Sequence, residues 1–301
     1  MESIYRLIKS GDDEARAHLR KVSGELTTQK AIECLINKLL YAYERKYGDL
    51  RPPINAWLLA RLVEAEVEAA PPSLTSEGQL LPVQGGFIIR YRMGLPLQRI
   101  RLTICHEIAH TFFYDRSLPV PKRPLGKRPT SEEEQICFQI ARQLLVPQET
   151  LRGYMGSISN FPRLSLLSRL AKTFQVSLPV MAMRLTQDTS LISNSIFTFW
   201  EIRNPTNIVD RELTEERLDN FVTRSFKPKL SYLSPSLAQI LSTYWRTRLF
   251  RTAGSLVEQA ACTGTVKSKS LEIGKRKRFQ FLLEARGWGA DRMMTAASLG
   301  R

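Results

Sequence analysis

The stretch LQRIRLTICHEIAHTFFYD, residues 97–115, decides how the rest of the chain is interpreted. Its apolar residues recur at helical spacing, which predicts a helix from about Leu97 to Tyr114. Within it stands HEIAH, residues 106–110. Residues four apart on a helix lie one turn above each other, with Cβ atoms about 5–6 Å apart. The imidazoles of His106 and His110 can therefore bind one metal ion.

Glu107 lies between the two histidines and supplies a proton acceptor. It points to the side of the same helix face, so it can take a proton from metal-activated water without being a ligand. The setting of the motif is apolar, and buried histidines need partners. Two core histidines bonded to backbone or carboxylate groups would also satisfy this need, but the complete motif favours a metal site. The apolar neighbours are Ile104, Cys105, Ile108, Ala109 and Phe112.

A catalytic zinc needs a third protein ligand. The chain has three histidines, and the third, His18, lies in a charged N-terminal segment and is predicted to be a surface residue. Phe113 and Arg116 stand where a longer form of the motif has a glycine and a third histidine, so that form is excluded. The third ligand is therefore expected to be a carboxylate from the cluster Glu132-Glu133-Glu134.

The acidic cluster begins the next predicted helix, which runs from the N-cap Ser131 to Pro147. Its apolar stripe can be read through Phe138 in register with Glu134, or through Cys137 in register with Glu133. Both faces are apolar. Periodicity therefore leaves both glutamates open as the ligand.

The remaining patterns predict an α+β fold. We expect two short helices around a turn at residues 175–177, with the length of a helix-turn-helix. Because the second helix is mostly apolar with one arginine, a buried bracing or substrate-docking pair is favoured over DNA contact. The other expected elements are charged helices over residues 1–50 ending at Gly48, an amphipathic helix over 54–70, a hairpin near 80–83 and 87–91, a loop over 115–131, and a strand in ISNSIFTFWEIR, residues 192–203.

Composition limits the partners and the compartment. The net charge of +15 favours an acidic partner such as nucleic acid, although a solvated basic surface explains it equally well. The run Lys275–Arg278 and the basic-aromatic cluster over 245–251 have the same two readings. The four scattered cysteines are expected to be reduced thiols. With neither a signal-peptide core nor a stretch able to span a bilayer, the chain is expected in the cytoplasm, with no membrane partner.

HEIAHTFFYD, followed by EEEQICFQIARQLLVP, resembles the ImmA/IrrE family of bacterial metallopeptidases. The glycine-containing hairpin, the Leu-Leu-x-Pro turn at 144–147 and the later helix-turn-helix-like segment extend the resemblance over about residues 50–187. It implies a zincin-like peptidase domain over 1–155, a helix-turn-helix-like segment over 156–190 and a mixed C-terminal domain over 191–301 with a sensory or partner-binding role. Alignment of the turn places Glu134 in the ligand position, with Glu133 as second choice. Phe138 replaces the usual polar follower.

The resemblance also implies the function. The chain is expected to be a zinc-dependent endopeptidase, with manganese as an alternative metal, that cleaves a helix-turn-helix repressor and so derepresses stress or mobile-element genes. Glu107 would take a proton from water and pass it to the leaving amine. Tyr114, Arg116 and Tyr91 are candidates for stabilising the oxyanion. The rival is a regulator that binds DNA or zinc without cleaving a peptide.

Overall fold

The computed structural model describes residues 15–125, 128–155, 164–188, 192, 195–202, 226–233, 257, 267–273, 279–287 and 292–299. The chain divides into two units, Met1–Tyr154 with Thr173–Ser177, and Met155–Lys172 with Leu178–Arg301. Helices and small sheets are both present, so the predicted α+β class is confirmed. Among the described helices, none is long and apolar enough to cross a membrane.

Capping residues set the ends of the helices in the first unit. Thr27 accepts a hydrogen bond from the backbone of Lys30 at the start of α2, and Gly48 ends that helix as predicted. At the start of α5, the cap is Thr130 rather than the predicted Ser131, because the Thr130 hydroxyl accepts from the Glu133 N–H. The helices are α2 (Thr28–Tyr47), α3 (Ala56–Leu62), α4 (Leu97–His110), η1 (Thr111–Phe113), α5 (Ser131–Leu145) and α6 (Gln148–Met155).

A small sheet of β1 (Ala65–Ala70), β2 (Gly78–Val83) and β3 (Gly86–Arg92) stands in the order β1-β3-β2. The predicted hairpin is confirmed, because β2 pairs antiparallel with β3 from Gly78↔Tyr91 to Val83↔Gly86. Gly85 adopts φ +83 in the two-residue turn, a conformation that glycine adopts without strain. Strand β2 thus forms one edge of the sheet.

The prediction of one helix over residues 54–70 was wrong in its second half. Helix α3 ends at Leu62, Glu64 adopts φ 54, and residues 65–70 form β1. Strand β1 pairs in parallel with β3, and the Glu64 carbonyl accepts a hydrogen bond from Phe87 N–H at 2.9 Å. A distant strand therefore overrides the local helical propensity of this alanine- and glutamate-rich segment.

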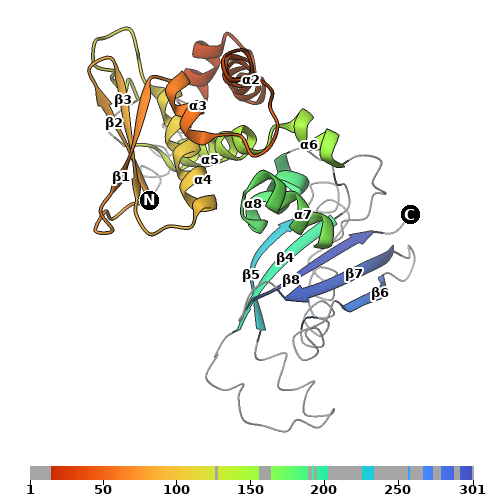
Figure 1. The fold of residues 1–301 in the computed structure, drawn as a ribbon. Coiled ribbons are helices and arrows are strands. Elements are labelled where there is room, and N and C mark those ends of the chain that lie inside the picture. Colours follow the sequence, from red (N-terminus) through yellow and green to blue (C-terminus); the bar gives the residue numbers. More distant parts are fainter. Residues whose placement is uncertain are drawn as a thin grey trace, which may run out of the picture. The chain divides into compact units, whose positions relative to one another are not determined.

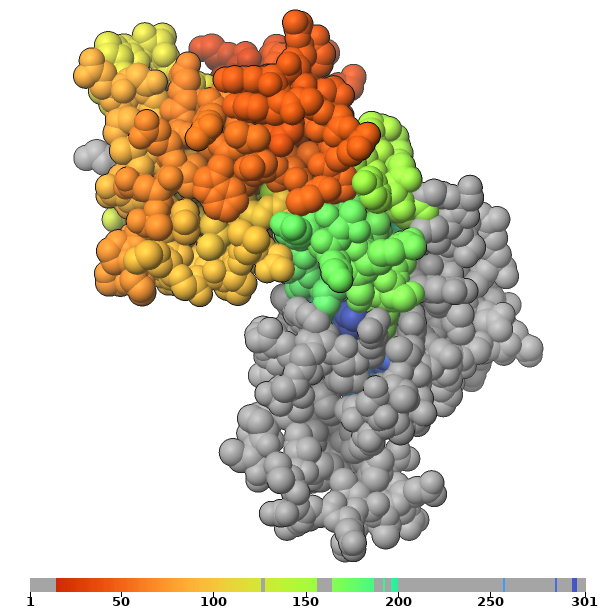
Figure 2. All heavy atoms as spheres, viewed as in Figure 1, coloured from red at the N-terminus to blue at the C-terminus, as the bar shows by residue number. Residues whose placement is uncertain are grey.

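Helix α4 is the centre of the first unit. It contacts α3 and α5 as well as β2 and β3, and Figure 1 shows it beside the sheet. In the space-filling view, the red-to-orange atoms of α2, α3 and the early strands lie against one another over this unit (Figure 2). Every residue from Arg101 to His110 is buried. The pentapeptide HEIAH thus lies within the core.

The second unit combines helices with an antiparallel sheet in the order β5-β4-β8-β7-β6. Strand β4 lies where the sequence predicted a strand. Strand β5 contacts α8 and η2. The helices are α7 (Leu164–Phe174), α8 (Leu178–Met183) and η2 (Arg184–Asp188), and the strands are β4 (Ser195–Ile202), β5 (Phe226–Leu233), β6 (Lys267–Ile273), β7 (Phe279–Gly287) and β8 (Arg292–Leu299).

Candidate metal centre

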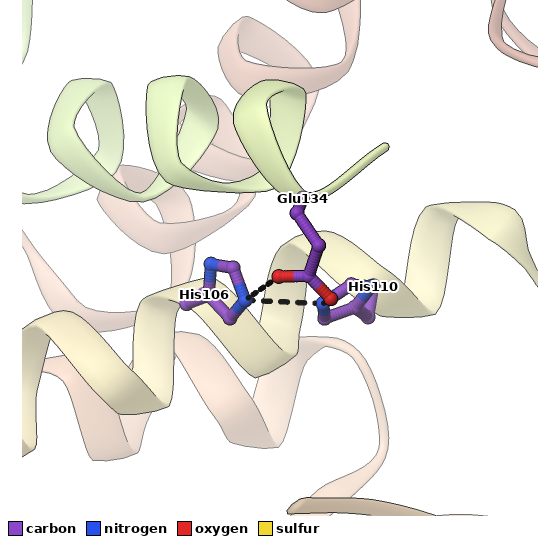
Figure 3. Close-up of side chains that lie close together, drawn as sticks. All are labelled: His106, His110 and Glu134. Atoms are coloured by element: carbon purple, nitrogen blue, oxygen red, sulfur yellow. Dashed lines mark hydrogen bonds and ion pairs between the residues drawn. The ribbon is translucent and has the colours of Figure 1, made fainter. Parts of the chain in front are cut away.

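Three side chains from two helices converge at one point. Helix α4 presents His106 and His110, α5 presents Glu134, and the three point toward one another (Figure 3). The two Nε2 atoms are 3.1 Å apart. Glu134 Oε2 lies 3.0 Å from His106 Nε2, and Oε1 lies 3.5 Å from His110 Nε2. The helical spacing thus aligns the two imidazoles, and α5 adds the carboxylate.

These donors fit a zinc ion. Two atoms that each lie about 2.0–2.1 Å from a tetrahedral zinc are about 3.3 Å apart, which matches the separations observed here. Two imidazole nitrogens with one carboxylate are also a donor set typical of catalytic zinc sites, which leave one position open. Both histidines are buried, whereas Glu134 is partly exposed toward the cavity. The geometry therefore supports a metal ion held by these three residues.

The protonation states of Glu134 and His106 suit a metal, whereas, against the effect of burial, Cys137, Glu133 and Glu134 raise the pKa of His110, so a metal ion would have to displace its proton. Hydrogen bonds from His106 and then His110 hold the pKa of Glu134 below its usual range. Burial lowers the pKa of His106. A charged carboxylate and a neutral imidazole are the forms that bind metal ions.

Glu107 lies beside this group in the same cavity. It is buried, and burial raises its pKa to about 7, where a general base works best near neutral pH. Gly78 of β2 packs against it. A Cβ at position 78 would lie 2.6 Å from Glu107 Oε1 and 2.4 Å from Thr103 Cγ2. Glycine is therefore required at this point for the strand to approach the carboxylate.

Glu133, the second-choice ligand, faces the other side of His110. Its Oε1 lies 3.0 Å from His110 Nδ1, and its side chain is fully buried. Arg123 donates to both of its oxygens, at 2.7 and 2.8 Å. The sequence interpretation missed Arg123, because a basic residue in a loop has no local pattern that indicates its distant partner.

The three candidates for oxyanion stabilisation lie in different places. Tyr114 lines the cavity, and the Arg123 guanidinium lies over its ring, 5.6 Å from the centroid. Arg116 instead donates to the Val63 carbonyl and pairs with Glu64, outside the residues that line the cavity. Tyr91 also lies outside that lining and packs edge-on against Trp57. Of the three candidates, Tyr114 is the one that lines the cavity.

His18, predicted to be a surface residue, is half-buried. Its Nε2 lies 3.2 Å from the Phe112 carbonyl, to which it can donate, and its ring stacks on Phe113. Burial lowers the pKa of His18. A charged N-terminal segment with one buried face explains why composition misplaced this residue.

A cavity of about 600 Å³ opens beside the three converging side chains. Strand β2 forms one wall, and α4 and α5 supply the others. Phe138 lies in the cavity lining, with its ring 4.1 Å from that of His106. The lining residues are Ser76, Glu77, Gly78, Gln79, Leu80, Arg99, Leu102, Thr103, His106, Glu107, His110, Tyr114, Arg123, Pro129, Glu134 and Phe138.

The helix-turn-helix-like segment has a buried second helix. Val180, Met181 and Ala182 of α8 are buried, and Arg184, the one arginine in the predicted reading helix, is 1 % exposed. A groove-reading helix would present such residues to solvent. The basic run at 275–278 and the basic-aromatic cluster over 245–251 lie outside the described residues.

Comparison with known proteins gives one family match. Residues 76–186 match the peptidase M78 model, described as the IrrE N-terminal-like domain. No curated protein matches the chain. A solved structure described as a Mycobacterium tuberculosis transcriptional regulator aligns with 96 % of this chain and 76 % of that chain, at 11 % identity and a TM-score of 0.43. That likeness is too weak to carry an argument.

Proposed function

We propose that the chain is a zinc-dependent endopeptidase, on the premise that residues 76–186 match the peptidase M78 model, the IrrE N-terminal-like domain. The convergence of His106, His110 and Glu134 beside the buried Glu107 carries the proposal. The metal would be held by His106, His110 and Glu134. Zinc is favoured because two imidazoles and a carboxylate suit it, with manganese as the alternative.

The residues of the cavity can be assigned roles in peptide hydrolysis. A bound zinc supplies Lewis acidity, which polarises a carbonyl and lowers the pKa of water. Glu107 takes a proton from the attacking water and delivers it to the leaving amine, for which its pKa of about 7 is suited. The Tyr114 hydroxyl donates to the oxygen on which negative charge develops. Burial raises the pKa of Tyr114, so the hydroxyl keeps its proton.

The edge strand β2 supports an extended peptide as substrate. Arg92 N–H donates to the Glu77 carbonyl at 2.9 Å, so these two residues form a hydrogen-bonded pair within the hairpin. Alternation along an antiparallel ladder then turns the backbone groups of Gly78 and Leu80 away from β3. Both residues line the cavity. A substrate strand can pair with them and place its scissile bond beside Glu107.

The substrate class follows from the family resemblance. We propose a helix-turn-helix transcriptional repressor, whose cleavage would derepress stress or mobile-element genes. A protein substrate fits the open edge strand, because a segment unfolded from the repressor could pair with it along several residues. The cytoplasm, where such repressors act, is the proposed location.

The proposal is tested by metal content and cleavage together. Elemental analysis of the purified protein should find near-stoichiometric zinc, lost in His106→Ala, His110→Ala and Glu134→Ala. Glu107→Gln should keep the metal and lose cleavage by about 10²–10⁴-fold, the usual contribution of a general base. Each purified protein would be added to a bacterial extract, and mass spectrometry would identify the new N-termini. These termini would report cleavage and reveal the substrate. Equal cleavage by Glu107→Gln, or binding of neither zinc nor manganese after reconstitution, would refute the enzyme.

A further inference from the structure

A second cluster of metal-ligating side chains lies behind His110. His110 Nδ1, a Glu133 oxygen and Cys137 Sγ are close together, and all three residues are buried. Glu133 Oε1 is 3.0 Å and Cys137 Sγ is 3.4 Å from His110 Nδ1. This cluster is a poor second metal site, because the Arg123 guanidinium already pairs with both Glu133 oxygens and would repel a cation.

The loop after α4 is built to hold Arg123 in this place. Asp115 and Lys122 form an isolated antiparallel bridge, in which each backbone N–H donates to the other residue's carbonyl, with N···O distances of 2.8 and 3.0 Å. Arg123 follows directly, and its guanidinium lies over the Tyr114 ring. Its side chain is 9 % exposed. A buried, two-pronged ion pair of this kind fixes the Glu133 carboxylate in orientation as well as in charge.

The carboxylate in turn fixes the ring of His110. Arg123 donates to both Glu133 oxygens, at 2.7 and 2.8 Å, and so holds the carboxylate beside His110 Nδ1. The Glu133 oxygen, 3.0 Å from Nδ1, can accept a proton carried there, which leaves Nε2 on the cavity side available to ligate a metal beside Glu134 and His106. We propose that Glu133, clamped by Arg123, is a positioning residue that orients His110 for metal binding. This inference rests on the proposed zinc site.

The other histidine lacks this support. His106 Nδ1 is buried without a hydrogen-bond partner among the described residues, and its ring packs against Phe138 instead. Among the described residues, His110 is therefore the histidine ligand whose Nδ1 is within hydrogen-bond distance of a carboxylate. The contrast makes Glu133 the residue whose loss should affect zinc binding most after the three ligands themselves.

Zinc affinity measured by chelator competition tests the inference. Glu133→Ala should weaken zinc binding by about 10–100-fold, and Glu133→Gln less, because an amide oxygen still accepts from Nδ1. Glu132→Ala is the matched control: it removes a carboxylate from the same helical turn, but Glu132 pairs with Arg16 rather than with His110. It should leave zinc affinity within about twofold, whereas an equal loss would mean that the first-turn charge alone matters.

A spectroscopic measurement separates positioning from a merely structural role. In zinc-loaded protein, long-range ¹H–¹⁵N correlation of the three histidines should show His110 carrying its proton on Nδ1. That proton should exchange faster with solvent in Glu133→Ala and in Arg123→Met than in wild type. Glu133→Gln should have an unchanged thermal unfolding temperature, which shows that the fold does not depend on this charge. Wild-type-like zinc affinity and proton exchange in Glu133→Ala would overturn the inference alone. Binding of neither zinc nor manganese by wild type would overturn the proposed function and this inference together, whereas unchanged cleavage by Glu107→Gln would refute the enzyme and leave the positioning role standing.

Discussion

Glu133 and Glu134 are adjacent in sequence but have different surroundings. Glu134 lies at the cavity, 3.0 Å from His106 Nε2, whereas Glu133 is enclosed with Arg123 and faces the opposite nitrogen of His110. Successive residues on a helix point about 100° apart, since there are 3.6 per turn. The two carboxylates therefore reach opposite sides of one imidazole. We therefore propose different roles for these two adjacent residues, Glu134 as a ligand and Glu133 as a positioning residue.

A substitution at Gly78 tests how closely β2 packs against Glu107. Gly78→Ala places a methyl group against Thr103 and Glu107, so the carboxylate must shift. We expect cleavage to fall by about 10²-fold, because misplacement of a catalytic group by about 1 Å has this effect. Zinc content should be retained, since His106, His110 and Glu134 lie on α4 and α5. Steady-state kinetics with elemental analysis measures both.

The control for Gly78 is Gly153→Ala in α6, where no atom lies within 4 Å of the added Cβ. It should keep full activity and gain about 0.5–1 kcal/mol of stability as alanine replaces glycine in a helix. Unchanged cleavage in Gly78→Ala would show that Glu107 is not confined by β2.

At the scale of elements, β2 is the strand that we propose to pair with an extended substrate. It pairs with β3 on one side and lines the cavity with Gly78 and Leu80. Pro82 lies two residues beyond Leu80, so its missing N–H also falls on the side away from β3. The strand thus tolerates proline at an outward position.

Leu80→Pro should remove one outward N–H and leave the hairpin intact. We expect the KM for a peptide substrate to rise by about two- to tenfold, the equivalent of one hydrogen bond of about 0.5–1.5 kcal/mol, with zinc content unchanged. Leu80→Ala is the control for loss of the side chain alone, and it should affect KM less. If both variants raise KM equally, the Leu80 side chain rather than the strand edge binds the substrate.

At the scale of the whole molecule, the net charge of +15 keeps DNA binding as the rival to proteolysis. The buried α8 and Arg184 argue against groove reading by the helix-turn-helix-like segment. The exposed basic residues of α7 include Arg169 and Lys172. The net charge and the exposed basic residues of α7 therefore support an attraction to phosphates that does not depend on base sequence.

Affinity for duplex DNA should therefore be independent of sequence and sensitive to salt. Fluorescence anisotropy with two unrelated duplexes should give equal affinities, falling by about 10³-fold or more between 50 and 200 mM salt if six or more phosphates are contacted. Arg169→Ala with Lys172→Ala should weaken binding to both duplexes alike. Preference for one duplex that survives 200 mM salt would favour the regulator over the peptidase.

The helices with strong periodicity, the hairpin and the pairing of His106 with His110 are local properties, and the sequence alone determined them. Spacing along one helix sufficed for the histidines, because a helix places residues four apart on one face. The segment 65–70 became a strand through pairing with β3, and Arg123 reached Glu133 through a bridged loop. The half-buried place of His18 likewise depends on Phe112 and Phe113, which lie far along the chain. Such features were decided by the tertiary structure, because their energies come from partners that no local pattern specifies.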